Sequence, residues 1–342
     1  MKCQDQLDPG EQYLTNLNQG IQRKKRSWIF ENNSIFAFRT MRKIITISLL
    51  IFLLAPDMAS AQRWKRQRYE FSFGMGVSNF LGELGGANQI GTHYFKDLEF
   101  SQTRLAAAIG LRYKLSNYFA VKTHLTYGRV SGDDKLTTER FRHMRNINFF
   151  ADIYEWNLNF EGAFQQEQIG HRYRLKKVKG LKGYELYTYL FAGVGIFYFN
   201  PKADFQGQTY NLREYHTEGQ GYVPTRADYS TIQFCIPLGI GFKYTIDRQW
   251  GLGLEFGIRK TFTDYIDDCS TTYIDLSSYQ TGEQYAVGQY LANPSDRSDP
   301  AAVSSTSPGQ QRGDPRYKDS YMFAIFSVNY KIKTGRNNLP RF

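Results

Sequence analysis

The chain has 342 residues, a formal net charge of +11 and a mean hydropathy of −0.52. That low mean hydropathy excludes a bundle of membrane-spanning helices, but it is compatible with a β-barrel, which exposes only alternate residues to lipid. The 26 Phe, 25 Tyr and 30 Gly residues favour strands and tight turns. The positive charge is compatible with nucleic-acid binding, but no such motif accompanies it, so we expect no nucleic-acid partner.

An export signal is expected at residues 41–61. Arg42 and Lys43 form a short charged region, residues 44–55 are apolar, and Ala59-Ser60-Ala61 offers the small residues that signal peptidase requires. The apolar run is shorter than the roughly 20 residues that a spanning helix needs. A cleaved signal peptide is therefore favoured over the alternative, a short membrane anchor.

This signal divides the chain into three parts. A secretory signal acts from an N-terminus, so we interpret residues 1–40 as an upstream translation artefact or a dispensable leader. We expect the mature protein to begin at about Gln62 and residues 62–342 to form one domain.

The mature chain alternates between apolar and polar residues with period two, which is the pattern of a strand with two different faces. In the segment 250–260, for example, one face consists of Trp250, Leu252, Leu254, Phe256 and Ile258. The opposite face consists of Gly251, Gly253, Glu255, Gly257 and Arg259. The eight segments with this pattern are 69–80, 103–114, 118–128, 152–161, 184–199, 230–244, 250–260 and 321–332.

Eight segments of about the length that crosses a bilayer predict an all-β fold, an eight-stranded antiparallel transmembrane β-barrel with long extracellular loops. A soluble sandwich or lipocalin-like barrel is the alternative, but the faces opposite the aromatics carry charges of both signs. Paired charges suit the interior of a small barrel better than a soluble core. We expect a lumen charge network of Glu70, Arg104, Arg112, Lys122, Glu155, Glu161, Glu255 and Arg259.

The connections alternate between short and long in the order that an outer-membrane barrel requires. The turns 115–117 and 247–249 are short and would face the periplasm of a Gram-negative bacterium. The long connections 81–102, 131–151, 200–229 and 263–320 would face the outside. We therefore expect an outer-membrane location with lipid around the barrel.

The connection 165–183 is long and basic, although it falls on the periplasmic side. Its basic residues are Arg172, Arg174, Lys176, Lys177, Lys179 and Lys182. They are expected either to meet anionic lipid headgroups or to form a docking patch for an acidic periplasmic protein. The loop 263–320 is acidic, with nine Asp and Glu against four Lys and Arg, and we expect a solvated loop or packing over the barrel mouth rather than a calcium site.

No catalytic motif is recognisable. The five histidines are scattered, and neither a metal-ligand spacing of cysteines nor a phosphate-binding loop occurs. We expect no catalytic residue, no metal and no cofactor. A lipid-modifying barrel enzyme using His93, His143 or His216 in the outer loops is a less favoured alternative.

Three stretches resemble the outer-membrane barrels typified by PorG, a component of the type IX secretion system. They are Gly76–Gly85, Phe191–Pro201 and Thr263–Tyr273. The resemblance covers most of the mature chain, although residues 290–316 are not matched. It implies a non-enzymatic accessory or anchoring component that contacts periplasmic subunits of the secretion complex. A stand-alone barrel, acting as an adhesin or a small-solute pore, is the alternative.

Overall fold

The computed structural model describes residues 67–82, 84, 100–165, 167, 186–247, 249–275, 277 and 283–333. All of them belong to the second of two compact units, which spans Ala61–Phe342. The expected leader (1–40), the signal peptide (41–61) and the basic residues between 172 and 182 lie outside the described residues.

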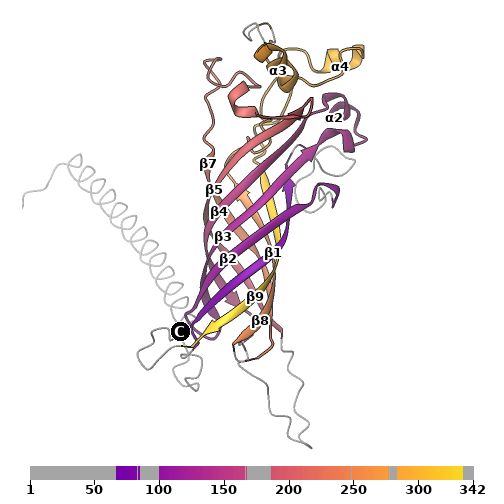
Figure 1. Ribbon diagram of the computed structural model, residues 1–342. Helices are drawn as coiled ribbons and strands as arrows, with labels where there is room; N and C mark the ends of the chain where they lie inside the picture. The colour runs from indigo at the N-terminus through magenta and orange to yellow at the C-terminus, as the bar shows by residue number, and fades with distance from the viewer. Residues whose placement is uncertain are drawn as a thin grey trace, which may run out of the picture. The chain divides into compact units, whose positions relative to one another are not determined.

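Eight long antiparallel strands close into one barrel (Figure 1). They are β1 (Tyr69–Leu81), β2 (Arg104–Lys114), β3 (Phe119–Asp133), β4 (Asn148–Ala163), β5 (Leu186–Phe205), β7 (Ile232–Thr245), β8 (Trp250–Thr261) and β9 (Ser320–Ile332). Each pairs with its neighbour along the chain, and β1 pairs with β9 to close the sheet. The predicted eight-stranded antiparallel barrel is confirmed, and all eight segments form strands.

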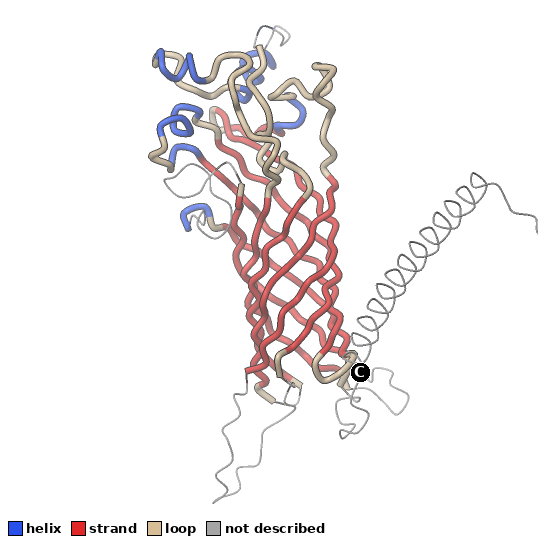
Figure 2. The backbone as a smooth tube through the Cα atoms, turned by 180° about the vertical axis from the view of Figure 1, so that it is seen from behind, coloured by secondary structure: helices blue, strands red, loops and turns tan. Residues whose placement is uncertain are grey.

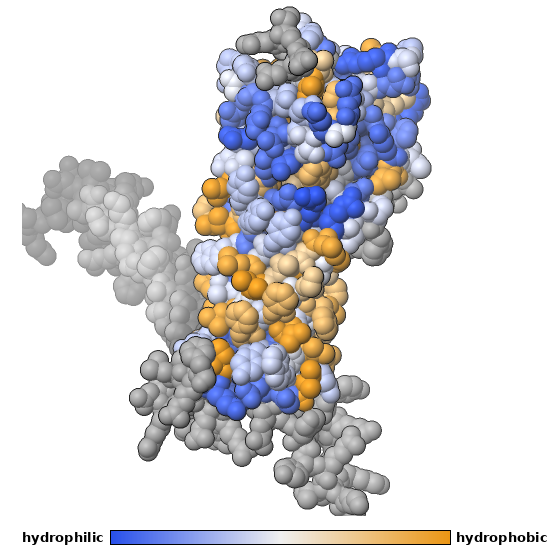
Figure 3. All heavy atoms as spheres, viewed as in Figure 1, coloured by the Kyte–Doolittle hydropathy of each residue, from blue (hydrophilic) through white to orange (hydrophobic). Residues whose placement is uncertain are grey.

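The alternation in sequence becomes an inner and an outer face. Along β8 the even-numbered apolar residues point outward, and Leu254 and Phe256 are exposed. Met75 on β1 and Val194 on β5 are 61% and 63% exposed, which a soluble protein would not favour for a continuous apolar surface. On the face seen in Figure 3, this apolar surface forms a zone below a largely polar upper part.

Aromatic side chains frame that apolar zone at two heights. At one end, Tyr69 packs against Tyr113 and Trp250 against Tyr330, with ring centroids 5.0 and 4.8 Å apart. Nearer the other end, three outward tyrosines follow one another across neighbouring strands. These are Tyr127, Tyr154 and Tyr198, with successive centroids 5.1 and 6.3 Å apart. Such paired girdles are typical of barrels that lie in a bilayer.

Strand geometry gives the thickness between the two girdles. On β3, Phe119 belongs to the lower girdle, where it stacks on Phe160, and Tyr127 belongs to the upper one. Eight residues at about 3.3 Å each, tilted by roughly 40°, span about 20 Å. That is close to the roughly 25 Å apolar band of outer-membrane barrels.

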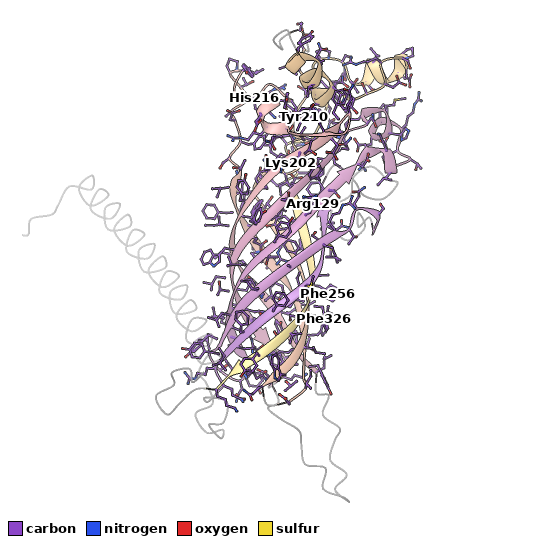
Figure 4. All side chains as sticks on the ribbon, in the orientation of Figure 1. Arg129, Lys202, Tyr210, His216, Phe256 and Phe326 are labelled. Carbon is purple, nitrogen blue, oxygen red and sulfur yellow. The ribbon has the colours of Figure 1, made fainter. Side chains whose placement is uncertain are left out.

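Three strands continue beyond the upper girdle, farther than the sequence pattern indicated. β3 runs on to Asp133, β4 begins at Asn148 and β5 ends at Phe205, where it pairs with the short β6 (Gln208–Asn211). Their outward residues become polar there, as Arg129 and Lys202 do, whereas Phe256 and Phe326 lie lower on the barrel (Figure 4). The barrel wall therefore projects out of the apolar zone on this side.

The two ends of the barrel differ in their connections. The turn end carries the tight turns, where the Leu115 amide donates to the Phe119 carbonyl and the Ile246 amide to the Trp250 carbonyl. The loop end carries all helices of the described residues (Figure 2): η3 (Phe100–Gln102), η4 (Asp134–Leu136), α2 (Arg140–Arg145), η5 (Leu212–Tyr215), α3 (Glu283–Ala292) and α4 (Pro300–Ser305). Among these described helices, none is long and apolar enough to cross a membrane.

Candidate functional site

The interior of the barrel is filled by side chains from its turn end to its loop end. At the turn end lies a group of charged residues that we call the floor cluster: Glu70, Arg112, Lys114, Glu161, Glu167, Lys243 and Lys331. Arg112 is central, with its Nε 2.5 Å from Glu161 and its Nη1 3.6 Å from Glu70. Lys243 reaches Glu70 from the opposite wall.

The middle of the lumen holds one ion pair between β3 and β8. Lys122 Nζ lies 2.5 Å from Glu255 Oε1, and the Tyr189 hydroxyl donates to the same oxygen at 2.5 Å. His124 lies 3.9 Å from the second oxygen of Glu255. These contacts cross the barrel from wall to wall, so they fill its cross-section as well as neutralise charge.

A third group lies toward the loop end. Arg259 Nε is 3.2 Å from Glu155, and Tyr321 donates to Glu155 at 2.7 Å. The Arg259 guanidinium lies 4.6 Å from the centre of the Phe323 ring, a cation–π geometry. Above it the interior becomes apolar, with Phe197 and Phe199 fully buried.

Seven of the eight residues expected in the lumen network thus lie in these three groups. Arg104 does not: its side chain is exposed near the loop end, where it donates to Ser131 at 3.0 Å and to Gln102 at 3.2 Å. It begins β2, at the point where the inner face opens toward the loops. The prediction that Arg104 lies in the lumen is therefore wrong, because the strand begins at this residue and the inner face is already open there.

Sequence reasoning missed several members of the interior. Lys114, Lys243 and Lys331 lie on the polar faces of their strands, so the alternation contained a signal for them. Glu167 lies on the connection between β4 and β5, which has no periodicity. No sequence pattern marks it as an interior residue.

Glycines on the inner wall make room for an aromatic column from β5. A Cβ at Gly239 would lie 2.5 Å from Phe191, and one at Gly241 would lie 2.2 Å from Tyr189. Contacts this short do not occur between real atoms, so only glycine fits beside these rings. Tyr187, Tyr189 and Phe191 are all buried and occupy the space that the glycines leave.

A second polar cluster joins three connections at the loop end. We call it the cap lock, and it consists of Asp134, Arg145, Glu218, Asp268 and Arg312. Arg145 forms two bonds to Asp134, at 2.7 and 3.0 Å. Arg312 pairs with Glu218 at 3.0 Å and donates to the Asp268 carbonyl. These residues come from the β3–β4, β5–β7 and β8–β9 connections, which are therefore fastened to one another.

Four of the nine carboxylates of the acidic loop 263–320 are turned inward. Asp264, Asp267, Asp268 and Asp319 are all buried, and Glu218 accepts from the Ser270 and Thr271 amides at 2.9 Å. Burial raises the pKa of the Asp268 carboxyl to about 6, while Arg312 and donors from Thr217 and Tyr229 oppose this. Packing over the barrel mouth, not solvation, describes this part of the loop.

The described part of the chain contains no group of three His, Cys, Asp or Glu side chains arranged to hold a metal ion. Cys235 on β7 and Cys269 on the β8–β9 connection are both buried, and neither forms a disulfide within the described residues. Of the three outer-loop histidines, His93 lies outside the described residues, His143 is on α2 and His216 follows η5 beside Asp228. His143 and His216 lie on different connections.

Comparison with known proteins identifies the family. Residues 46–292 match the family described as "Domain of unknown function (DUF6089)". The chain belongs to this DUF6089 family. The match covers the first seven strands of the barrel and extends to the end of α3. A comparison with curated proteins finds no match.

Solved barrels resemble this DUF6089 member only distantly. Ail, the attachment invasion locus protein of Yersinia pestis, is 9% identical with a TM-score of 0.33, over 78% of this chain and 98% of Ail. Neisserial surface protein A is 8% identical with a TM-score of 0.34, over 77% and 96% of the two chains. The outer-membrane protein OprG from Pseudomonas aeruginosa is 8% identical with a TM-score of 0.31, over 79% and 98%. No ligand or role is transferred from them.

Proposed function

We propose that this DUF6089 barrel is a non-enzymatic protein of the bacterial outer membrane, closed to solutes, that acts through protein contacts at its two ends. The observation that carries the proposal is the filled interior. Ion pairs and aromatic rings cross the lumen at three heights, from Lys243 with Glu70 to Arg259 with Glu155. A narrow eight-stranded barrel packed in this way leaves no continuous aqueous path.

The orientation follows from the connections. Outer-membrane barrels keep short turns on the periplasmic side and long loops outside. The turn end would then face the periplasm, and the cap lock would hold a rigid surface outside the cell. The predicted signal peptide at 41–61 supplies the export that this orientation needs.

The more specific proposal is an anchoring role in the type IX secretion system. It rests on the resemblance of Gly76–Gly85, Phe191–Pro201 and Thr263–Tyr273 to PorG-like barrels, and on the basic residues between 172 and 182. A cluster of cations on the periplasmic side would steer and orient an acidic partner subunit. The stand-alone alternative, a surface adhesin, is favoured instead by the fastened loop end.

Two experiments test these proposals separately. In planar bilayers the purified barrel, with folding verified by heat-modifiable migration, is expected to show no single-channel steps. Steady channel openings would contradict the closed lumen.

Partner contact is tested by affinity purification in mild detergent. Replacing Arg172, Arg174, Lys176, Lys177, Lys179 and Lys182 by Gln is expected to remove a periplasmic subunit while the barrel still assembles. A matched control replaces Lys135 and Arg140, exposed cations at the loop end. Unchanged recovery of the subunit, or normal type IX secretion in a deletion strain, would reject the anchoring role.

A further inference from the structure

One carboxylate of the floor cluster does not come from a strand. Glu70 and Glu161 lie on β1 and β4, but Glu167 lies beyond Ala163, the last residue of β4. Its side chain is only 1% exposed and reaches back into the lumen. It is therefore held inside the barrel by its contacts and not by the hydrogen-bonded sheet.

Four cations converge on this carboxylate. One oxygen, Oε2, lies 2.5 Å from Lys114 and 3.3 Å from Arg112. The other, Oε1, lies 2.7 Å from Lys331 and 3.0 Å from Lys243. Each oxygen thus bridges two cations, and the four donors are spaced to hold a single carboxylate group.

The carboxylates on the strands do not provide a partner for every cation at this site. Among the described residues, Arg112 and Lys243 have other carboxylate partners, whereas Lys114 and Lys331 pair with Glu167 alone. Both lysine side chains are at most 4% exposed. Buried ammonium groups without a counter-charge are strongly unfavourable, so the site favours an anion whether or not Glu167 supplies it.

We propose that the floor of the barrel is a carboxylate-binding site formed by Arg112, Lys114, Lys243 and Lys331. Glu167 occupies this site in cis, and an acidic side chain of a periplasmic polypeptide binds there in exchange for Glu167. The exchange breaks no strand pairing, because the tethered carboxylate lies outside the sheet. This proposal rests on the proposed function and its orientation, in which the turn end of the barrel faces the periplasm. The site would give an acidic partner a defined binding position at the turn end of the lumen.

Because Glu167 is linked covalently to the barrel, it competes with a free carboxylate at a high local concentration. A group linked to its site by a short chain has an effective concentration of about the millimolar range. A peptide carboxylate must overcome that concentration in the wild-type protein but not after Glu167→Ala. Removing the tethered carboxylate is therefore expected to strengthen binding of a fluorescein-labelled, amidated hexaglutamate peptide by at least tenfold.

The test uses the full chain in detergent micelles, with fluorescence anisotropy for the peptide and thermal unfolding for small anions. Glu167→Ala leaves the space of an acetate ion, so acetate is expected to restore its melting temperature and to compete with the peptide. Glu214→Ala, which removes an exposed carboxylate at the loop end, is the matched control and is expected to behave as wild type. Where Glu167→Ala fails to assemble, Glu167→Gln takes its place.

Several outcomes would overturn the proposal. They are equal peptide affinity for wild type and the Glu167 variants, peptide binding that survives an additional Lys114→Ala and Lys331→Ala change, and rescue by phosphate but not by acetate. Failure here leaves bilayer conductance and subunit recovery unaffected, so it is distinguishable from failure of the proposed function.

Discussion

Arg145 donates from Nη1 to the backbone carbonyl of Arg312 at 2.7 Å, although 167 positions separate the two residues. Each arginine also binds a carboxylate from its own side of the cap, Asp134 and Glu218 respectively. The Arg145 guanidinium thus binds the main chain of Arg312, and each of the two positive charges has its own carboxylate partner. This arrangement makes the three long connections one structural unit.

Arg312→Met should release that unit without opening the barrel. Arg312 is 1% exposed, and its loss leaves Glu218 buried without its cationic partner. Breaking a buried pair from one side typically costs about 3–5 kcal/mol. We expect cleavage of the cap by a soluble protease to accelerate more than a hundredfold, while heat-modifiable migration of the barrel persists.

Arg316→Met serves as the control for this change. Arg316 pairs with Asp314 at the surface, with its side chain 79% exposed, and such pairs contribute roughly 0–1 kcal/mol. Equal protease sensitivity of the two variants would show that Arg312 does not fasten the cap.

The cap should lose stability as the pH rises through the range of Asp268. Burial is the main cause that raises the pKa of the Asp268 carboxyl in the folded cap from its ordinary 3.8 to about 6. The folded cap therefore binds the proton more tightly than the unfolded chain does, so the contribution is full below about pH 4 and is lost as the pH rises to about 6. The difference between the two values corresponds to roughly 3 kcal/mol.

Hydrogen exchange of cap amides between pH 4 and 7, corrected for intrinsic rates, measures this effect. Asp268→Asn does not titrate; its amide oxygen can accept from one of the two hydroxyls that Asp268 binds, those of Thr217 and Tyr229, while its NH2 group faces the other. In the Asp268→Asn variant, the stability of the cap should not change between pH 4 and 7, except for the contribution of other titrating groups. A wild-type cap that instead gains stability between pH 4 and 6 would contradict the raised pKa.

The strands were predictable because lipid and a packed lumen impose opposite demands on alternate residues. The pattern in 250–260, for example, became β8 almost residue for residue. The upward extensions of β3, β4 and β5 were not predictable in the same way. Above the tyrosine girdle the outer face carries Arg129 paired with Asp152, so the apolar signal ends before the strand does.

The cap and the floor were beyond the reach of sequence patterns for a related reason. Contacts such as Arg145 with Arg312 depend on how aperiodic loops fold over the barrel, and Glu167 reaches the lumen from a connection. Net charge in a loop also says little about exposure, since Asp267 and Asp268 are fully buried. Arg104 shows the converse error, because it keeps the inward alternation but lies at the open rim.

Gly239→Val should block assembly, whereas Gly162→Ala should be tolerated. A Cβ at Gly239 would lie 2.1 Å from the Phe256 carbonyl oxygen and 2.5 Å from Phe191, and neither the backbone nor the packed ring has room to move. At Gly162 the nearest atom, on Phe119, is 3.7 Å away. Overpacking typically costs about 1–3 kcal/mol, and occasionally more. The fraction of heat-modifiable barrel after refolding measures both variants, and equal folding yields would argue against the tight inner wall.

Lys122 and Glu255 should show strong coupling in a double-mutant cycle. Lys122 is buried in the lumen, the Glu255 side chain is 13% exposed, and the two charged groups are 2.5 Å apart, so Lys122→Met or Glu255→Gln alone leaves one unpaired charge and should cost about 3–5 kcal/mol. The combined variant leaves no isolated charge of this pair, and the Gln side chain still accepts from the Tyr189 hydroxyl. We expect the double variant to be more stable than either single one, so the coupling energy should exceed the larger of the two single losses. Denaturant unfolding in lipid vesicles measures all four proteins.

Additive losses in the double-mutant cycle would mean that the charges of Lys122 and Glu255 are stabilised separately, by water in the lumen. The closed interior on which the proposed function rests would then be wrong.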